Sequence, residues 1–343
     1  MCEIGENGNC DSPLEEFIVM CRWISSASAL LLLVAGTGCE GEGGKATGSE
    51  GGPCYGNGTC DGGLECRYGV CVNPSSGADV VQGIDLGGTT DYGTSKDPGS
   101  GGCTTNCGDM VTVSGGSFWQ GCNAAVNTFC VAHKSPYHEV TVPAFEIDRF
   151  EVTVGLYGDC VTGGSCTAPT GTSPGCNWNK AGKEAHPVNC ITWYQAGEYC
   201  AWAGKRLCSE SEWEKASRGT DGREYPWGNV PATCEYAVMD DGGVGCGTVG
   251  TMAVGSKPGG ASPYGAMDMS GNVWEWVEDD WHRSYNEAPT DGSTWMDNPR
   301  ASYRVRRGGS FEDDDGYMPS SSRYYDDPVY SNGSIGARCC RSK

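Results

Sequence analysis

The stretch that decides the fold is Arg304-Val-Arg-Arg-Gly-Gly-Ser-Phe311, which is followed by a long polar loop and then by Gly336-Ala-Arg-Cys339. Three further motifs lie upstream, in the order Ala203-Gly-Lys-Arg-Leu207, Glu210-Ser-Glu-Trp-Glu214 and Gly271-Asn-Val-Trp-Glu-Trp276. Their order within residues 108–343 indicates one large domain.

This series of motifs resembles the formylglycine-generating-enzyme domain, also called the sulfatase-modifying-factor domain. The resemblance covers residues 108–343 and implies an α+β, loop-rich fold. That fold is a variant of the C-type-lectin fold with little regular secondary structure.

The resemblance is weaker for activity. The family's oxidase needs two cysteines, a few residues apart in the loop after Gly-Gly-Ser, to hold copper(I) and activate a substrate thiol. The matching positions here are Asp313 and Met318, and the segment from Phe311 to Arg338 contains no cysteine. A hard carboxylate and a thioether do not suit copper(I), which prefers thiolates. We therefore expect no copper and no catalytic residues. Other positions that line the family's active site match Ser310, Trp274 and Tyr317.

The resemblance also implies a calcium site on the turn before Trp274. Hard cations take six to eight oxygen ligands, and a glycine turn lets carbonyl groups point inward. The alternative interpretation is that Glu275 is a buried hydrogen-bond hub beside two tryptophans. The implied calcium ligands are Asp268, Gly271, Val273 and Glu275.

Histidine offers little for metal chemistry. None of the chain's 4 histidines lies in a His-x-x-x-His pair, so the iron site of the related sulfoxide synthases has no visible ligands here. No P-loop or Gly-x-Ser-x-Gly elbow is present either.

Composition limits the class of protein. The 343 residues include 55 Gly and are only 38% hydrophobic, so much of the chain must be loop, while 11 Trp and 16 Tyr can build an aromatic core. The net charge of −21 argues against nucleic acid and anionic lipid headgroups, because phosphate contacts need clustered Lys and Arg. An acidic surface favours metal cations, cationic ligands or simple solubility.

The cysteines indicate an oxidising compartment. A reducing cytosol would leave 22 cysteines reactive, whereas outside the cytosol they form disulfides. The segment from Met20, with an apolar run at 27–35 and Gly36-Thr-Gly-Cys39, resembles a bacterial lipoprotein signal in which Cys39 is lipidated. We expect a bacterial envelope protein, lipid-anchored to the outer membrane or secreted. An ordinary cleaved signal or a short membrane anchor is the alternative, although the run is short for a bilayer.

The remaining N-terminal part divides by composition. Residues 1–39 are an extension and the signal, 40–53 a flexible stalk, and 73–107 a Gly/Ser/Asp linker. Between them, residues 54–72 hold four closely spaced cysteines in a unit too small for its own core, so we predict two disulfides. A zinc knuckle is the alternative, but Cys-x-x-Cys pairs are missing.

Periodicity within residues 108–343 predicts two strand regions and three helices. Thr192 is the expected N-cap of the second helix, and Ser209 with Glu212 forms a capping box for the third. The resemblance further implies a disulfide from Cys200 to Cys339, and the adjacent Cys340 should bond to a different partner. The expected strands are 110–119 and 140–148, and the expected helices are 152–160, 192–203 and 209–217.

We therefore predict a surface-anchored, non-catalytic binding or structural module. An active formylglycine-generating oxidase with relocated catalytic residues is the alternative. The ligand is an unknown protein or a glycan. Tyr324 and Tyr325 would suit a glycan, whereas carboxylates beside aromatic rings suit a cationic segment rich in Lys or Arg. These carboxylates are Glu312, Asp313, Asp314, Asp315, Asp326 and Asp327. The alternative is that these carboxylates only keep an exposed loop solvated and bind no ligand.

Overall fold

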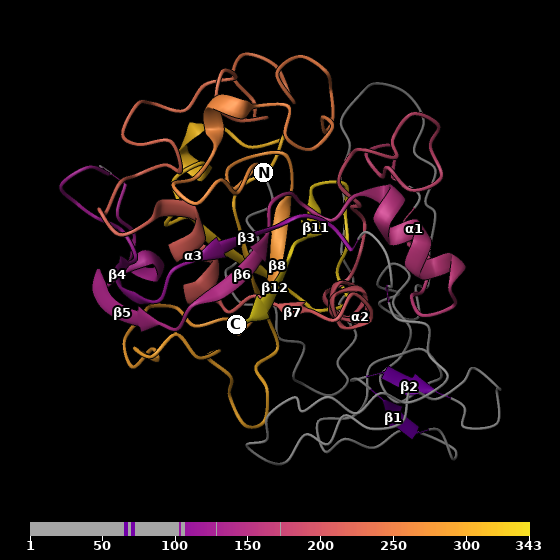
Figure 1. Ribbon diagram of the computed structural model, residues 1–343, viewed down its shortest axis with the longest axis horizontal. Helices are drawn as coiled ribbons and strands as arrows, with labels where there is room; N and C mark the ends of the chain where they lie inside the picture. Colours follow the sequence, from indigo (N-terminus) through magenta and orange to yellow (C-terminus); the bar gives the residue numbers. More distant parts are fainter. Residues whose placement is uncertain (1–64, 68–69, 73–102, 104–106, 128, 172) are drawn as a thin grey trace, which may run out of the picture. The chain divides into compact units, whose positions relative to one another are not determined.

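The computed structural model describes residues 65–67, 70–72, 103, 107–127, 129–171 and 173–343 (Figure 1). The chain divides into two compact units, residues 1–83 and 84–343. In the first unit, β1 (Glu65–Arg67) pairs antiparallel with β2 (Val70–Val72). The predicted signal, Cys39, the stalk and most of the Cys-rich module and linker lie outside the described residues.

Two four-stranded sheets form the centre of the second unit. One has the order β10-β9-β8-β11 and the other β3-β6-β12-β7, and a separate pair joins β4 to β5. All described pairings are antiparallel except β11 with β8. The strands are β3 (Met110–Val113), β4 (Gly116–Gln120), β5 (His138–Val142), β6 (Phe145–Asp148), β7 (Arg206–Leu207), β8 (Trp274–Asp280), β9 (Arg304–Arg307), β10 (Arg323–Asp326), β11 (Ile335–Ala337) and β12 (Cys339–Ser342).

The segment predicted as one strand over residues 140–148 is two strands. β5 ends at Val142 and β6 begins at Phe145, with Pro143 between them. Proline has no N–H to donate to a sheet ladder, so pairing stops there. β5 pairs with β4 and β6 pairs with β3, so the chain turns a corner between two sheets.

All three predicted helices are present, close to their predicted bounds. They are α1 (Val154–Thr162), α2 (Trp193–Trp202) and α3 (Glu210–Arg218). Thr192 and Ser209 cap α2 and α3 through complete capping boxes with Gln195 and Glu212. Figure 1 shows α3 on one side of the central strands and α1 with α2 on the other. None of the helices in the described part is long and apolar enough to cross a membrane. Three short 3-10 helices are η1 (Ala132–Lys134), η2 (Pro258–Gly260) and η3 (Asp315–Tyr317).

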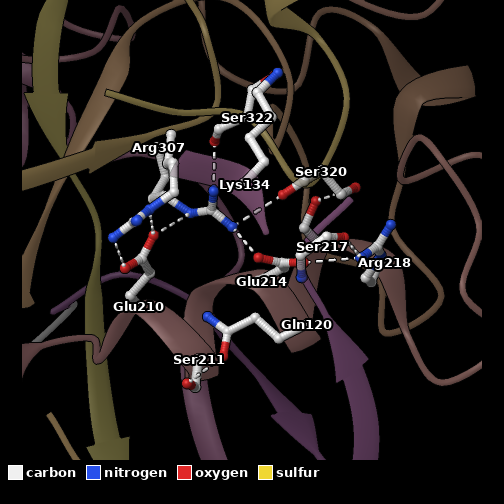
Figure 2. Close-up of polar contacts among 12 residues, drawn as sticks. Gln120, Lys134, Glu210, Ser211, Glu214, Ser217, Arg218, Arg307, Ser320 and Ser322 are labelled. Atoms are coloured by element: carbon white, nitrogen blue, oxygen red, sulfur yellow. Dashed lines mark hydrogen bonds and ion pairs between the residues drawn. The ribbon is translucent and has the colours of Figure 1, made fainter. Parts of the chain in front are cut away.

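Helix α3 is buried along its whole length although it is rich in charge. Glu214 accepts from Arg218 at 2.8 Å and also pairs with Arg307, as Figure 2 shows. Glu210 forms two hydrogen bonds of 2.7 Å with Arg323. Because unpaired buried charges are very costly, these long-range pairs fix where α3 lies against the sheet.

Lys134 joins the edge of this network. Its Nζ donates to Ser322 Oγ at 3.1 Å (Figure 2). Burial, together with the nearby Arg307, lowers the pKa of Lys134 to about 8. The ammonium form is therefore destabilised in the folded protein.

Every cysteine from Cys103 onward forms a disulfide in the structure. Cys200 bonds to Cys339, the pair implied by the family resemblance, and Cys208 bonds to Cys340. The two adjacent cysteines of β12 therefore have different partners, as predicted. They tie β12 to α2 and to the segment after β7.

Candidate functional site

The loop after β9 turns on two glycines. Gly308 and Gly309 have φ angles of +103° and +74°, a region that side chains rarely adopt. A Cβ on Gly309 would lie 2.6 Å from Met318 Cε and 2.9 Å from Tyr317 O. The glycine therefore lets the start of the loop pack directly against its far end.

Asp313 is held inside this loop by three hydrogen bonds to one carboxylate oxygen. Its Oδ2 accepts from Trp274 Nε1 at 2.9 Å, from Ser310 Oγ at 2.6 Å and from the Ser310 N–H at 2.9 Å. The structure thus brings Asp313, Ser310 and Trp274 together. The carboxylate works as a local hydrogen-bond acceptor that orders the loop.

Met318 is fully buried and packs in a cluster with Tyr225, Ala237 and Met239. Its backbone carbonyl accepts from Ser270 Oγ at 2.7 Å. The thioether is therefore part of the core.

Copper(I) does not fit these residues. The two positions that would supply thiolates hold a carboxylate engaged by Trp274 and Ser310 and a thioether packed in the core. Within the described residues, no group of three His, Cys, Asp or Glu side chains could hold a metal ion. The donor set supports no copper chemistry at this loop.

Aromatic rings surround the loop. Trp274 is only 3% exposed, and Tyr317 and Tyr324 contact it with ring centroids 6.2 Å away in each case. These tyrosines are 41% and 42% exposed, so they carry the aromatic surface out to solvent. Tyr325 stacks on Tyr324 and on Trp281, which extends the aromatic row along β10.

Arg306 fills the space between two of these rings, and sequence reasoning missed it. Its guanidinium carbon lies 4.9 Å from the Trp274 ring centroid and 5.0 Å from that of Tyr324. Its Nε lies 2.9 Å from Asp326 Oδ2 as an ion pair without the alignment of a hydrogen bond. Burial lowers the pKa of Arg306. The protein's own cation therefore occupies the inner aromatic face predicted for a ligand cation.

The outer carboxylates of the loop remain available. Glu312, Asp314 and Asp315 are exposed, and none forms an ion pair with a described residue. Asp314 caps η3 by accepting from the Gly316 N–H. Asp327 is likewise exposed and without an ion pair among the described residues, so the acidic character predicted for this surface rests on these three residues and Asp327, while Asp313 and Asp326 are engaged within the protein.

The turn implied to bind calcium precedes β8. A Cβ on Gly271 would lie 2.4 Å from Val238 O, so only glycine fits there. The Glu275 carboxylate accepts two 2.6 Å hydrogen bonds from Arg338 and one of 2.6 Å from Trp213 Nε1. Glu275 is therefore the hydrogen-bond hub of the alternative interpretation, and calcium binding at this turn stays a prediction.

Two further carboxylates lie close to this hub. Asp268 Oδ2 accepts from the Gly255 N–H at 2.6 Å, and burial raises the pKa of Asp268 to about 6, with Glu275 adding to the effect. Glu151, which the sequence did not single out, accepts from Asn272 Nδ2 at 2.6 Å. Burial, together with Asp268 and Glu275, raises its pKa well above the usual range.

The comparisons with known proteins bear on the family of the large domain. A family model described as "Sulfatase-modifying factor enzyme 1-like domain" matches residues 97–343. The hercynine oxygenase of Mycolicibacterium smegmatis is 30% identical over 260 residues, covering 65% of this chain and 58% of that protein. The formylglycine-generating enzyme of Mus musculus is 33% identical over 178 residues, 45% of this chain and 44% of that protein. The chain thus spans about half the length of these two relatives.

Among solved structures, PvdO from Pseudomonas aeruginosa is similar with a TM-score of 0.61 and 29% sequence identity. The match covers 69% of this chain and 95% of the PvdO chain.

Proposed function

Because the chain belongs to the family of sulfatase-modifying factor enzyme 1-like domains, we propose that it is a non-catalytic member that binds a partner through the loop after β9. Its fold is the predicted α+β, loop-rich variant of the C-type-lectin fold. The proposal sets it apart from relatives named as formylglycine-generating enzyme and hercynine oxygenase.

The observation that carries the proposal is that the Asp313 carboxylate is already hydrogen-bonded within the protein. A copper(I) oxidase centre needs thiolate ligands that are free to reach the metal. Here the carboxylate holds Trp274 and Ser310 in place, while Met318 lies in the core. Converting this loop to a copper site would require two substitutions and the loss of three hydrogen bonds.

The test of the non-catalytic part is direct. The purified protein is incubated with copper and a Cys-x-Pro-x-Arg peptide, beside a known formylglycine-generating enzyme as positive control. We expect no aldehyde product by mass spectrometry and no stoichiometric copper by elemental analysis. Aldehyde formation at a rate comparable to the control would instead support the oxidase with relocated residues.

We propose that the bound partner presents Lys or Arg to the exposed rim. Three exposed carboxylates, Glu312, Asp314 and Asp315, precede the exposed Tyr317 in the same loop, and both negative charge and the ring quadrupole attract cations. Because Arg306 already occupies the inner face of Tyr324, a ligand cation would meet the outer rim. A glycan that stacks on Tyr324 and Tyr325 is the alternative partner.

An Arg/Lys-rich nonapeptide is a suitable probe for the rim. Asp314→Asn with Asp315→Asn should weaken its binding several-fold, and binding should fall as salt rises, because screening acts over about 8 Å at physiological ionic strength. Glu139→Gln with Asp159→Asn removes the same charge from exposed positions elsewhere and serves as the control. Equal affinity of both double variants would remove the support for a cationic partner, and binding of neutral oligosaccharides alone would favour the glycan.

We place this module at the bacterial cell envelope, anchored to the outer membrane through a lipid on Cys39, with secretion as the alternative. The support is the lipoprotein-like segment ending in Gly36-Thr-Gly-Cys39. Cys39→Ser should move the protein from the membrane fraction to the soluble fraction. Unchanged fractionation would contradict the lipid anchor.

A further inference from the structure

A cavity of about 430 Å³ lies away from the loop after β9 and shares no lining residue with it. Its walls come from the two residues before β3, the end of β6 and its connection to α1, α1 itself, α2 and the loop at residues 184–185. Ligand pockets for small molecules typically measure about 300–1,000 Å³. The cavity therefore has the size for a small molecule.

The charges that line the cavity are all negative. Asp109, Asp148, Glu151 and Glu184 contribute carboxylates, and no lysine or arginine is among the lining residues. One of these is neutralised, because Asp148 Oδ1 lies 2.5 Å from Lys205 Nζ. Asp109 and Glu184 are exposed at the opening and form no ion pair with a described residue.

The Glu151 carboxyl lies at the buried end of the cavity, where burial raises its pKa and so favours its neutral form. Asp268 and Glu275 lie close enough to Glu151 to interact with it electrostatically. Arg338 is paired with Glu275 and is the cation that acts on this group. A cleft lined by one sign of charge within low-dielectric walls concentrates the opposite charge.

Apolar side chains form most of the rest of the wall. Phe150, Val152, Leu156 and Tyr199 line the cavity between the carboxylates. An aromatic face attracts cations as well as apolar groups. A bare metal ion would find poor ligands here, since no group of three metal-binding side chains occurs in the described residues.

We propose that this cavity binds a small organic ammonium ion. Its charged head lies toward Asp109 and Glu184, and its alkyl or aryl body packs against Phe150 and Leu156. The site is independent of the partner surface at the loop after β9, so either can exist without the other.

The test uses three matched probes that differ in charge: phenethylamine as the ammonium ion, 2-phenylethanol as the neutral analogue and phenylacetate as the anion. Calorimetric titration of the full chain at low salt should show binding of the amine alone. Asp109→Asn with Glu184→Gln should weaken that binding tenfold or more, and both residues are exposed, so the fold should tolerate the change.

The control is Asp314→Asn with Asp315→Asn, which removes the same charge from the other acidic surface. It should leave amine affinity unchanged. Equal binding of the neutral analogue, no binding of the amine, or equal weakening by both double variants would each overturn the proposal. Loss of peptide binding at the loop with retained amine binding would separate the two sites.

Discussion

Trp274 Nε1 donates a 2.9 Å hydrogen bond to Asp313 Oδ2, so the carboxylate in the loop after β9 anchors a neighbouring indole. The same oxygen accepts from both the hydroxyl and the backbone of Ser310. These hydrogen bonds to one carboxylate oxygen thus order the loop.

Replacing this carboxylate should destabilise the domain. Asp313→Ala leaves the Trp274 indole N–H without its acceptor, and Trp274 is largely buried. An unsatisfied buried donor costs about 1–3 kcal/mol. Asp313→Asn keeps an oxygen acceptor and should cost less. Urea denaturation followed by tryptophan fluorescence gives both values; equal stability of Asp313→Ala and wild type would show that these hydrogen bonds contribute nothing.

Calcium at the turn before β8 has a separate test. A ligand that binds only the folded state stabilises it by about 2.7 kcal/mol at a concentration one hundred times its dissociation constant. We expect chelation to lower the melting temperature, and Asp268→Asn to remove that response while leaving the Glu275–Arg338 pair intact. Glu275→Ala alone is not a suitable test of calcium binding, because it leaves the buried Arg338 guanidinium without its ion-pair partner. A melting temperature that does not change on chelation would contradict calcium binding and would leave Glu275 with its hydrogen-bonding role only.

Lys134 should make stability depend on pH. Its pKa falls from 10.5 to about 8 on folding, so between these values the unfolded chain binds more protons than the native state. The free energy of unfolding should therefore rise with pH in this window, by about 3 kcal/mol in full. Lys134→Met should flatten the slope between pH 8 and about 9.5, below ordinary tyrosine titration. The exposed Lys180→Met is the control; identical slopes in both variants would contradict the assignment.

The Cys200–Cys339 disulfide should stabilise the folded domain more than a disulfide that closes a short loop. Its cysteines are 139 residues apart, whereas Cys103 and Cys107 are separated by 4. The chain-entropy model gives about 5 kcal/mol for the first and about 2 for the second when no other disulfide closes the same loop. Because Cys208–Cys340 closes nearly the same loop as Cys200–Cys339, both double-alanine variants are made and compared by denaturation in a chain that also carries Cys208→Ala and Cys340→Ala. A larger loss from the short loop would show that strain or residual structure outweighs chain entropy.

Patterns among neighbouring residues predicted the helices correctly, whereas contacts between residues far apart in the chain could not be predicted from the sequence. Thr192 and Ser209 predicted the starts of α2 and α3, because an N-cap residue and its capping-box partner lie within one helical turn of each other. Arg306 lies in the motif that decided the fold, yet its role depends on Asp326 and Trp274, which come from other strands. The acidic cavity could not be predicted from the sequence either, because its lining residues come from separate segments of the chain.

Strand β12 is an interior strand of its sheet, with β6 on one side and β7 on the other. Its two cysteines also close disulfides to residues far upstream. During synthesis, β6 and β7 therefore lack their shared neighbour until this last strand has emerged. Oxidation before this strand is available would leave Cys200 and Cys208 free to pair with each other or with earlier cysteines. Under oxidising conditions, formation of the native disulfides should consequently require isomerisation of such early pairs.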